Sequence, residues 1–191
     1  MFLSGMAKHL PKEDPKIKEI VAVLKDILST PSEVVQATVS DALSPLAPKL
    51  ATDAEALTEL VQYFLEALTK GATYGRRRGA AYGLAGLVRG TRISALKKQG
   101  IMDAIKAATD TKSDKPAKEG GLMAIECLCS KLGRMFEPYI ITVLPMLLAA
   151  FSDGSQEVRW LHPDVAAAKA VSWSAILSLI NSYIVLHYVA E

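Results

Sequence analysis

Residues 73–90 read TYGRRRGAAYGLAGLVRG, in which three successive arginines lead directly into a run of small residues. Gly79, Ala80, Gly83 and Gly86 recur at the spacing of one helix face. Because each glycine costs a helix about 1 kcal/mol relative to alanine, this helix needs a compensating contact. We expect its small residues to pack closely against the other helix of the same hairpin.

The segments that flank this stretch show helical periodicity in pairs. Residues 54–70 carry apolar side chains at intervals of three and four, and Gly71 follows them as a C-cap. Residues 17–28 predict a helix that ends near Ser29, and residues 30–32 then stop it and cap a second helix. Two further hairpins are expected, one from residues 100–109 with 115–133 and one from Pro138 onward.

Four short stretches align with one another at a spacing of roughly 40 residues, which is the period of HEAT and armadillo arrays. They are EVVQA at 33–37, RRRGA at 76–80, AKEGG at 117–121 and QEVR at 156–159. A hairpin of this kind cannot bury its apolar face alone, so neighbours stack. The sequence therefore predicts an all-α, HEAT/armadillo-like α-solenoid of about four antiparallel helical hairpins over residues 1–159, followed by a divergent hydrophobic helix or tail at 160–191.

Composition narrows the class of function. The net charge of +2 is too small for nucleic-acid binding by overall charge, so any basic function must be local. Cys127 and Cys129 lie two apart in an apolar run, as expected of core residues in a reduced, intracellular protein. The first residues become charged within about ten positions, which does not suit a secretory signal.

The sequence offers no arrangement of catalytic, metal-binding or cofactor-binding residues. His9, His162 and His187 lie far apart, without a nucleophile or carboxylate at a catalytic spacing. The glycines of residues 73–90 match neither a P-loop nor a dinucleotide-binding loop. Glu126 and Glu137 are better explained as solvated helix charges. We therefore expect a protein that is not an enzyme and that uses no metal or cofactor.

The arginine run has two interpretations. Since Arg76, Arg77 and Arg78 begin a helix, at least two of them should be solvated, either as an ordinary helix start or as a surface that binds phosphate or carboxylate groups. Further cations follow at Arg89, Arg92, Lys97 and Lys98, giving a basic stripe across one repeat that would suit an RNA-bearing partner. Only Tyr74 and Tyr82 accompany the stripe as aromatic residues, so we expect phosphate contact without base reading.

The C-terminal run VSWSAILSLINSYIVLHYVA, residues 171–190, is about as long as a bilayer span. Its serines, Asn181 and His187 dilute that apolarity, and a helix that covers the last repeat explains the run equally well. A membrane-anchored helical adaptor is therefore an alternative to a soluble scaffold.

Three stretches resemble a known family. RRGAAYGLAGLVRG at 77–90, ISALKK at 93–98 and the long match from Lys118 to Arg159, which contains LGRMFEPY and VLPMLL, resemble the central HEAT region of the general control translational activator family. The same region is similar to the HEAT domain of fungal translation elongation factor three. The resemblance covers roughly residues 7–159.

The resemblance implies a non-catalytic, cytoplasmic scaffold that associates with ribosomes. Members of that family assist the kinase that phosphorylates the α subunit of a translation initiation factor during amino-acid starvation or ribosome stalling. The implied partners are the ribosome, a cytosolic ATP-binding-cassette protein and that kinase. The candidates for ribosome or partner contact are Arg76, Arg77, Arg78, Arg89, Lys97 and Lys98.

Overall fold

The computed structural model describes residues 11, 14–111 and 113–151, and within these ranges every regular element is helical. The elements are α2 (Lys16–Ile27), α3 (Glu33–Leu43), α4 (Ala47–Leu50), α5 (Ala54–Lys70), α6 (Tyr74–Thr91), α7 (Ala95–Lys98), α8 (Ile101–Asp110), α9 (Lys115–Leu132), η1 (Gly133–Tyr139) and α10 (Ile140–Phe151). The predicted all-α class is confirmed.

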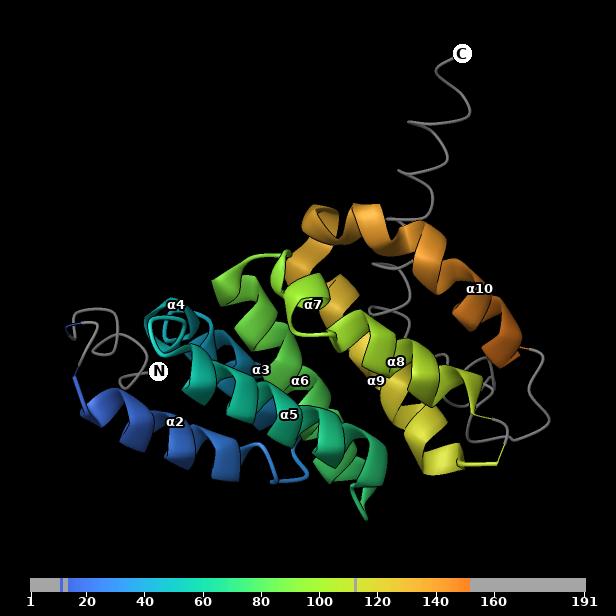
Figure 1. The fold of residues 1–191 in the computed structure, drawn as a ribbon. Helices are drawn as coiled ribbons and strands as arrows, with labels where there is room; N and C mark the ends of the chain where they lie inside the picture. The colour runs from blue at the N-terminus through green and yellow to red at the C-terminus, as the bar shows by residue number, and fades with distance from the viewer. Residues whose placement is uncertain (1–10, 12–13, 112, 152–191) are drawn as a thin grey trace.

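The long helices form stacked antiparallel hairpins (Figure 1). The hairpins are α2 with α3, α5 with α6, and α8 with α9, and α10 follows them as the next helix. The second helices of the three hairpins form a layer in which α6 lies between α3 and α9 and contacts both. The short elements α4, α7 and η1 connect successive hairpins. This arrangement is a HEAT-type solenoid.

Local sequence explains where the helices begin and end. The side chains of Asp53, Thr73 and Asp114 accept hydrogen bonds from backbone N–H groups in the first turns of α5, α6 and α9. Gly71 is the C-cap of α5, as the sequence predicts. Ser32 occupies the N-cap position of α3, although its side chain makes no capping hydrogen bond.

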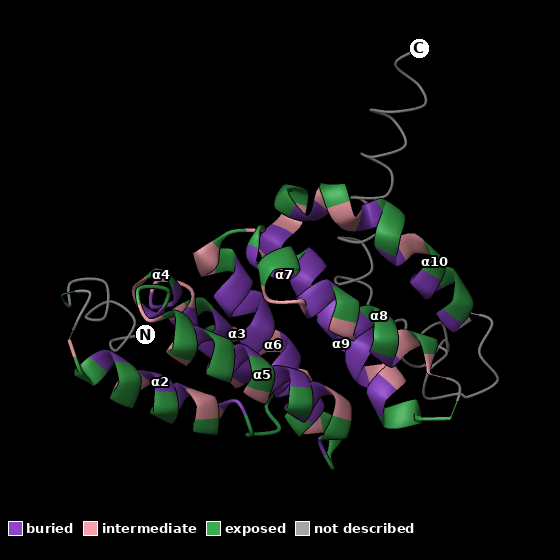
Figure 2. Ribbon diagram, in the orientation of Figure 1, coloured by how far each residue is buried: buried purple, intermediate pink, exposed green. Residues whose placement is uncertain are grey.

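One hydrophobic core runs through the described hairpins, from Ile17 to Ala150 (Figure 2). Phe64 and Phe136 are among its largest fully buried side chains. Cys127 and Cys129 also lie in this core, which confirms their predicted role. Burial raises the pKa of the Cys129 thiol to about 12.

The small residues of α6 have contacts that the sequence predicted only in part. A Cβ added to Gly83 would lie 2.6 Å from the ring of Phe64 in α5, so Gly83 does pack within its own hairpin. The same prediction is wrong for Gly79 and Gly86. A Cβ at Gly79 would lie 1.9 Å from the Leu28 carbonyl oxygen, and one at Gly86 would lie 2.5 Å from the carbonyl oxygen of Ser40. Because α6 has neighbours on two sides, its glycines serve the contact between hairpins as well.

Two predictions fall beyond the described residues. The hydrophobic run at 171–190 lies outside them, as does the boundary at residue 159 between array and tail, so both stay predictions. Within the described part, the helical stretch Lys115–Ala150 is long and apolar enough to cross a membrane by composition alone. That stretch contains α9, η1 and α10 as far as Ala150, and the apolar side chains of α9 from Ala117 onward are buried in the core.

Candidate functional site

The three arginines at the start of α6 have different environments. Arg76 is exposed, Arg78 is half-buried, and Arg77 is buried with 8% of its surface accessible. The prediction that at least two of the three are solvated is therefore wrong. Successive helix residues point about 100° apart, and α6 has a helix on each side, so two of these side chains reach neighbouring hairpins.

Arg77 connects the second hairpin to the third. Its Nη1 donates a hydrogen bond to the Gly71 carbonyl oxygen at 2.8 Å. Its Nη2 donates to the carboxylate of Glu119 in α9, and both side chains of this ion pair are about nine-tenths buried. Since removing one partner of a buried ion pair leaves an uncompensated charge, Arg77 is a structural joint.

Arg78 connects the second hairpin to the first. Its Nε donates to Gln36 Oε1 at 2.8 Å, its Nη1 to the carboxylate of Glu33 at 3.1 Å, and its Nη2 to the Pro31 carbonyl oxygen at 2.6 Å. The guanidinium also lies 5.2 Å from the ring centroid of Tyr74. With all three donor groups engaged, Arg78 is held against α3 and the turn that precedes it.

Gln36 is a buried polar residue that supports this joint, and the sequence reasoning missed it. Its Nε2 lies within hydrogen-bond distance of the carbonyl oxygens of Leu28, Thr30 and Gly75. The amide thereby supplies donors to the end of α2 and the start of α6. The sequence did contain a sign of this role. Gln36 is a polar residue within the apolar run of α3, and it aligns with Gly79 of α6 when the repeats are superimposed.

A second polar network crosses the surface formed by α3, α6 and α9. Lys131 in α9 donates to Asp41 Oδ1 at 2.9 Å and to the Ala37 carbonyl oxygen at 3.2 Å, both in α3. Arg89 in α6 donates to the same Asp41 oxygen at 3.0 Å. Tyr82 donates its hydroxyl proton to Glu33 at 3.1 Å, and burial raises the pKa of Tyr82. This network ties the first hairpin to the third across α6.

The other candidate cations lie in exposed positions. Lys97 and Lys98 are exposed on α7, and Arg92 is exposed just after α6. Within the described residues, the side chains of Arg76, Arg92, Lys97 and Lys98 have no hydrogen-bond or ion-pair partner. The candidates therefore divide into structural joints (Arg77 and Arg78), a half-exposed paired residue (Arg89) and exposed cations (Arg76, Lys97 and Lys98).

Residues 77–189 match the family model described as "EF3 N-terminal HEAT repeat". The chain is 45% identical over 175 residues to the human "Stalled ribosome sensor GCN1", a match that covers 92% of this chain and 6% of the relative. It is 39% identical over 169 residues to "eIF-2-alpha kinase activator GCN1" of Dictyostelium discoideum, covering 88% of this chain and 6% of the relative. The chain belongs to the HEAT-repeat family of GCN1 and elongation factor 3.

The relation to elongation factor 3 is more distant. "Elongation factor 3" of Gonapodya prolifera is 31% identical over 118 residues, which cover 61% of this chain and 10% of the relative. No solved structure matches the chain. The chain spans about 6% of the length of the GCN1 relatives that it matches. Membership of this family makes the described array a non-catalytic scaffold.

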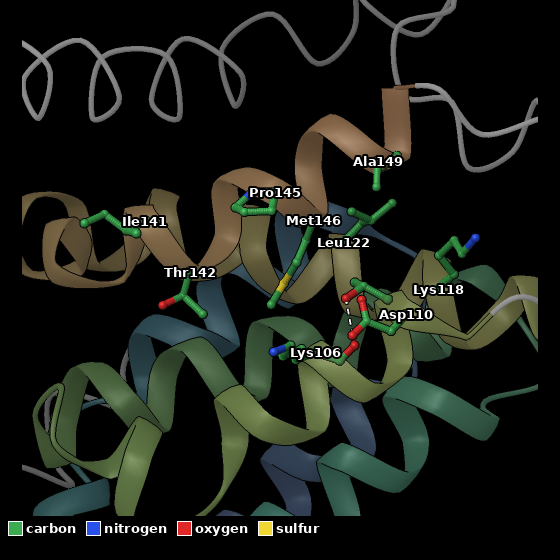
Figure 3. A pocket seen from close by; sticks show the side chains of 11 residues that line it. Lys106, Asp110, Lys118, Leu122, Ile141, Thr142, Pro145, Met146 and Ala149 are labelled. Carbon is green, nitrogen blue, oxygen red and sulfur yellow. Dashed lines mark hydrogen bonds between the residues drawn. The ribbon is translucent and has the colours of Figure 1, made fainter.

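The described part of this HEAT array also contains a cleft between α10 and the third hairpin. It has a volume of about 320 Å³, and Lys106, Asp110, Leu122, Pro145 and Met146 are among the residues that line it (Figure 3). Its lining is mostly apolar and contains no cysteine or histidine. No group of three metal-ligating side chains occurs among the residues that the structure describes.

Proposed function

We propose that this chain is a ribosome-binding HEAT module of a translational activator that works in the cytoplasm. The observation that carries the proposal is its 45% identity, over most of its length, to a protein whose name states that it senses stalled ribosomes. Four exposed, unpaired cations on the described array support the proposal, because ribosomes present phosphate and acidic protein groups.

We further propose that the module acts within the signalling route to the initiation-factor α-subunit kinase. Two relatives carry the name "eIF-2-alpha kinase activator", and the resemblance implies the kinase and an ATP-binding-cassette protein as partners. A scaffold suits this role because stacked hairpins present long surfaces for several partners at once. Starvation or ribosome stalling would supply the signal.

Among the candidate residues, the structure favours different roles. Arg76, Lys97 and Lys98 are free to contact a ribosome, and Arg89 can do so only in competition with Asp41. Arg77 and Arg78 support binding indirectly, because they fix the positions of the hairpins that carry the other four. A change of all three arginines together would therefore disturb the fold and give an ambiguous result.

Co-sedimentation of the 191-residue chain with ribosomes across a salt series tests the proposal. We expect binding that weakens with salt, and a several-fold loss of binding when Lys97 and Lys98 are both changed to Glu. The matched control changes Lys16 and Lys106 to Glu, which alters the net charge equally at exposed positions on α2 and α8. Absence of co-sedimentation at physiological salt by a folded chain would refute the proposal.

A further inference from the structure

The three connections between hairpins bring basic side chains to one edge of the solenoid. In antiparallel hairpins, the end of each second helix and the start of the next first helix meet at the same edge, and α4, α7 and η1 lie along it (Figure 1). Lys49 lies in α4, Lys97 and Lys98 lie in α7, and Arg134 lies in η1. Arg92 precedes α7. We call these five residues the basic edge.

The charge at this edge is mostly positive. The connections at residues 44–53, 92–100 and 133–139 contain the five cations and two acidic residues, Asp53 and Glu137, and Asp53 is paired with Lys18 of α2. At the opposite edge, the first two turns within hairpins, residues 28–32 and 71–73, contain no charged residue. Because the whole chain has a net charge of only +2, this edge concentrates positive charge locally.

Most of the basic edge is available to a partner. Arg92, Lys97, Lys98 and Arg134 are exposed, and Lys49 is half-buried. Glu137 is half-buried in η1 and is therefore less accessible than these cations. The network of Asp41, Arg89 and Lys131 occupies the neighbouring surface of α3, α6 and α9. At the edge, the side chains of Arg92, Lys97 and Lys98 have no hydrogen-bond or ion-pair partner among the described residues.

Arg92 provides a second, independent observation. It has φ 77° and ψ 161°, and among the described residues other than glycine it alone has a positive φ. Gly100 and Gly133 supply the other positive φ angles at this edge. Residues other than glycine rarely adopt such a conformation, and those that do are found preferentially at functional positions. Glycine would be unstrained at this position, so we take the arginine as a candidate for a functional contact.

The arrangement fits a phosphate backbone better than a protein partner. One cation group lies in each of three successive connections, and packed helices stand about 8–10 Å apart, so the groups form a ladder along the solenoid. Among these connections, Met135 is the exposed large apolar residue, whereas protein interfaces need a cluster of buried anchors. Phe136 and Tyr139 stack on each other at 5.7 Å and are buried or half-buried, so they are not presented to bases.

We propose that the basic edge binds the phosphate backbone of double-helical RNA without reading its sequence. The inference rests on the proposed function and makes it more specific, because it names ribosomal RNA as the part of the ribosome that the module contacts. It extends the predicted stripe from one repeat to three connections through Lys49 and Arg134, and it leaves Arg76, at the opposite end of α6, outside the RNA surface.

The test measures binding of the full chain to a labelled 20-base-pair RNA duplex by fluorescence anisotropy, at several salt concentrations. The edge variant carries Lys97→Glu, Lys98→Glu and Arg134→Glu. The control carries Lys16→Glu, Lys106→Glu and Lys115→Glu, three exposed lysines away from the edge. Thermal melting of both variants verifies that they fold, and this is expected because all six residues are exposed.

With three phosphate contacts, the wild-type affinity should fall roughly 40-fold between 50 and 200 mM salt. The edge variant should lose most of that dependence, whereas the control should keep it. Equal salt slopes for the two variants would overturn the inference. So would a polyglutamate peptide that binds the chain as tightly as the duplex does, since an acidic protein would then be the better partner.

Ribosome co-sedimentation, run in parallel, separates this inference from the proposed function. A chain that sediments with ribosomes but does not bind the duplex retains the proposed function and overturns RNA recognition, because a ribosomal protein would then supply the contact. A chain that binds the duplex through the edge but does not sediment with ribosomes has the RNA surface without the proposed function. A folded chain that does neither refutes both.

Discussion

Lys131 of the third hairpin lies 2.9 Å from Asp41 of the first, although a solenoid repeat ordinarily contacts only its immediate neighbours. The helix between them, α6, carries glycines at its contacts with the first hairpin and the residues that follow it, namely Gly79, Gly86 and Gly90. Since α6 can then approach α3 closely, a lysine side chain from α9 is long enough to cross it. The glycine run and the long-range ion pair are thus parts of one arrangement.

A double-mutant cycle of Lys131→Met and Asp41→Asn measures this link. We expect a coupling free energy of about 0.5–1 kcal/mol in chemical unfolding, decreasing with salt, because Asp41 is 53% exposed. The control cycle uses Lys18→Met and Asp53→Asn, a pair within 2.9 Å that is more exposed, and it should show weaker coupling. Additive effects at Lys131 and Asp41 would contradict a direct link.

The buried pair of Arg77 and Glu119 should contribute far more to stability. Arg77→Met leaves the Glu119 carboxylate buried without its partner, so we expect a loss of about 3–5 kcal/mol in the free energy of unfolding. The neighbouring change Arg76→Met, at an exposed position, should stay within about 0.5 kcal/mol of wild type. Urea denaturation of both variants gives the comparison. Equal stabilities would show that Arg77 does not hold the second and third hairpins together.

The helical array could be predicted from periodicity because burial of an apolar stripe is a local property of each helix. The limits of α5 and the C-cap Gly71 agree with the sequence pattern. The partners of Arg77 and Arg78 depend on how α6 is placed between α3 and α9, which no local pattern specifies. The repeat alignment nevertheless hinted at the ion pair with Arg77. Glu119 of the third hairpin aligns with Arg78 of the second, so a carboxylate stands next to the arginines once the hairpins stack.

The candidate surface was predictable only as a list of cations. Sequence spacing placed Arg76, Lys97 and Lys98 in a single stripe, but antiparallel hairpins bring Arg76 to one edge and α7 to the other. Arg134 joins α7 at that edge from a different hairpin. Segments about one repeat apart become neighbours only on stacking, so the surface follows from the tertiary structure.

Gly79 and Gly120 occupy the same position in successive repeats, and we expect that neither tolerates a side chain. A Cβ at Gly79 would lie 1.9 Å from the Leu28 carbonyl oxygen, and one at Gly120 would lie 2.0 Å from that of Leu68. We expect each Gly→Ala change to destabilise the chain by about 1–3 kcal/mol, despite the better helix propensity of alanine. The control is Ala107→Gly at an exposed position in α8, which measures the difference in helix propensity between alanine and glycine in the same melting experiment. Stabilisation by either alanine would contradict the close packing.

The core cysteines should be unreactive until the chain unfolds. Cys129 and Cys127 are buried, and the pKa of Cys129 is raised from its ordinary value of 9.0 to about 12, so the thiol is protonated at pH 8. We expect alkylation by iodoacetamide only in denaturant, followed by mass spectrometry. A Ser130→Cys variant, at an exposed neighbouring position, should react at once in the folded chain. Rapid alkylation of native Cys129 would contradict its burial.

The same shift makes stability depend on alkaline pH. A thiol whose folded-state pKa is raised favours folding fully below its unfolded pKa, and that contribution is lost as pH rises towards the folded value. Urea unfolding should therefore show falling stability between about pH 9 and 12. Cys129→Ala should reduce this dependence, leaving the part that arises from Tyr82, whose pKa burial also raises. An unchanged pH profile in the variant would assign the effect to other groups.

Arg92 should show opposite effects on stability and on binding. Glycine adopts φ 77° without strain, so Arg92→Gly should stabilise the chain by about 1 kcal/mol in thermal melting and weaken its binding to the RNA duplex. The matched control is Arg134→Gly, at an arginine of the same edge with no positive φ, which should weaken RNA binding without any gain in stability. If Arg92→Gly left binding unchanged while raising stability, the strain at Arg92 would have no connection with RNA recognition.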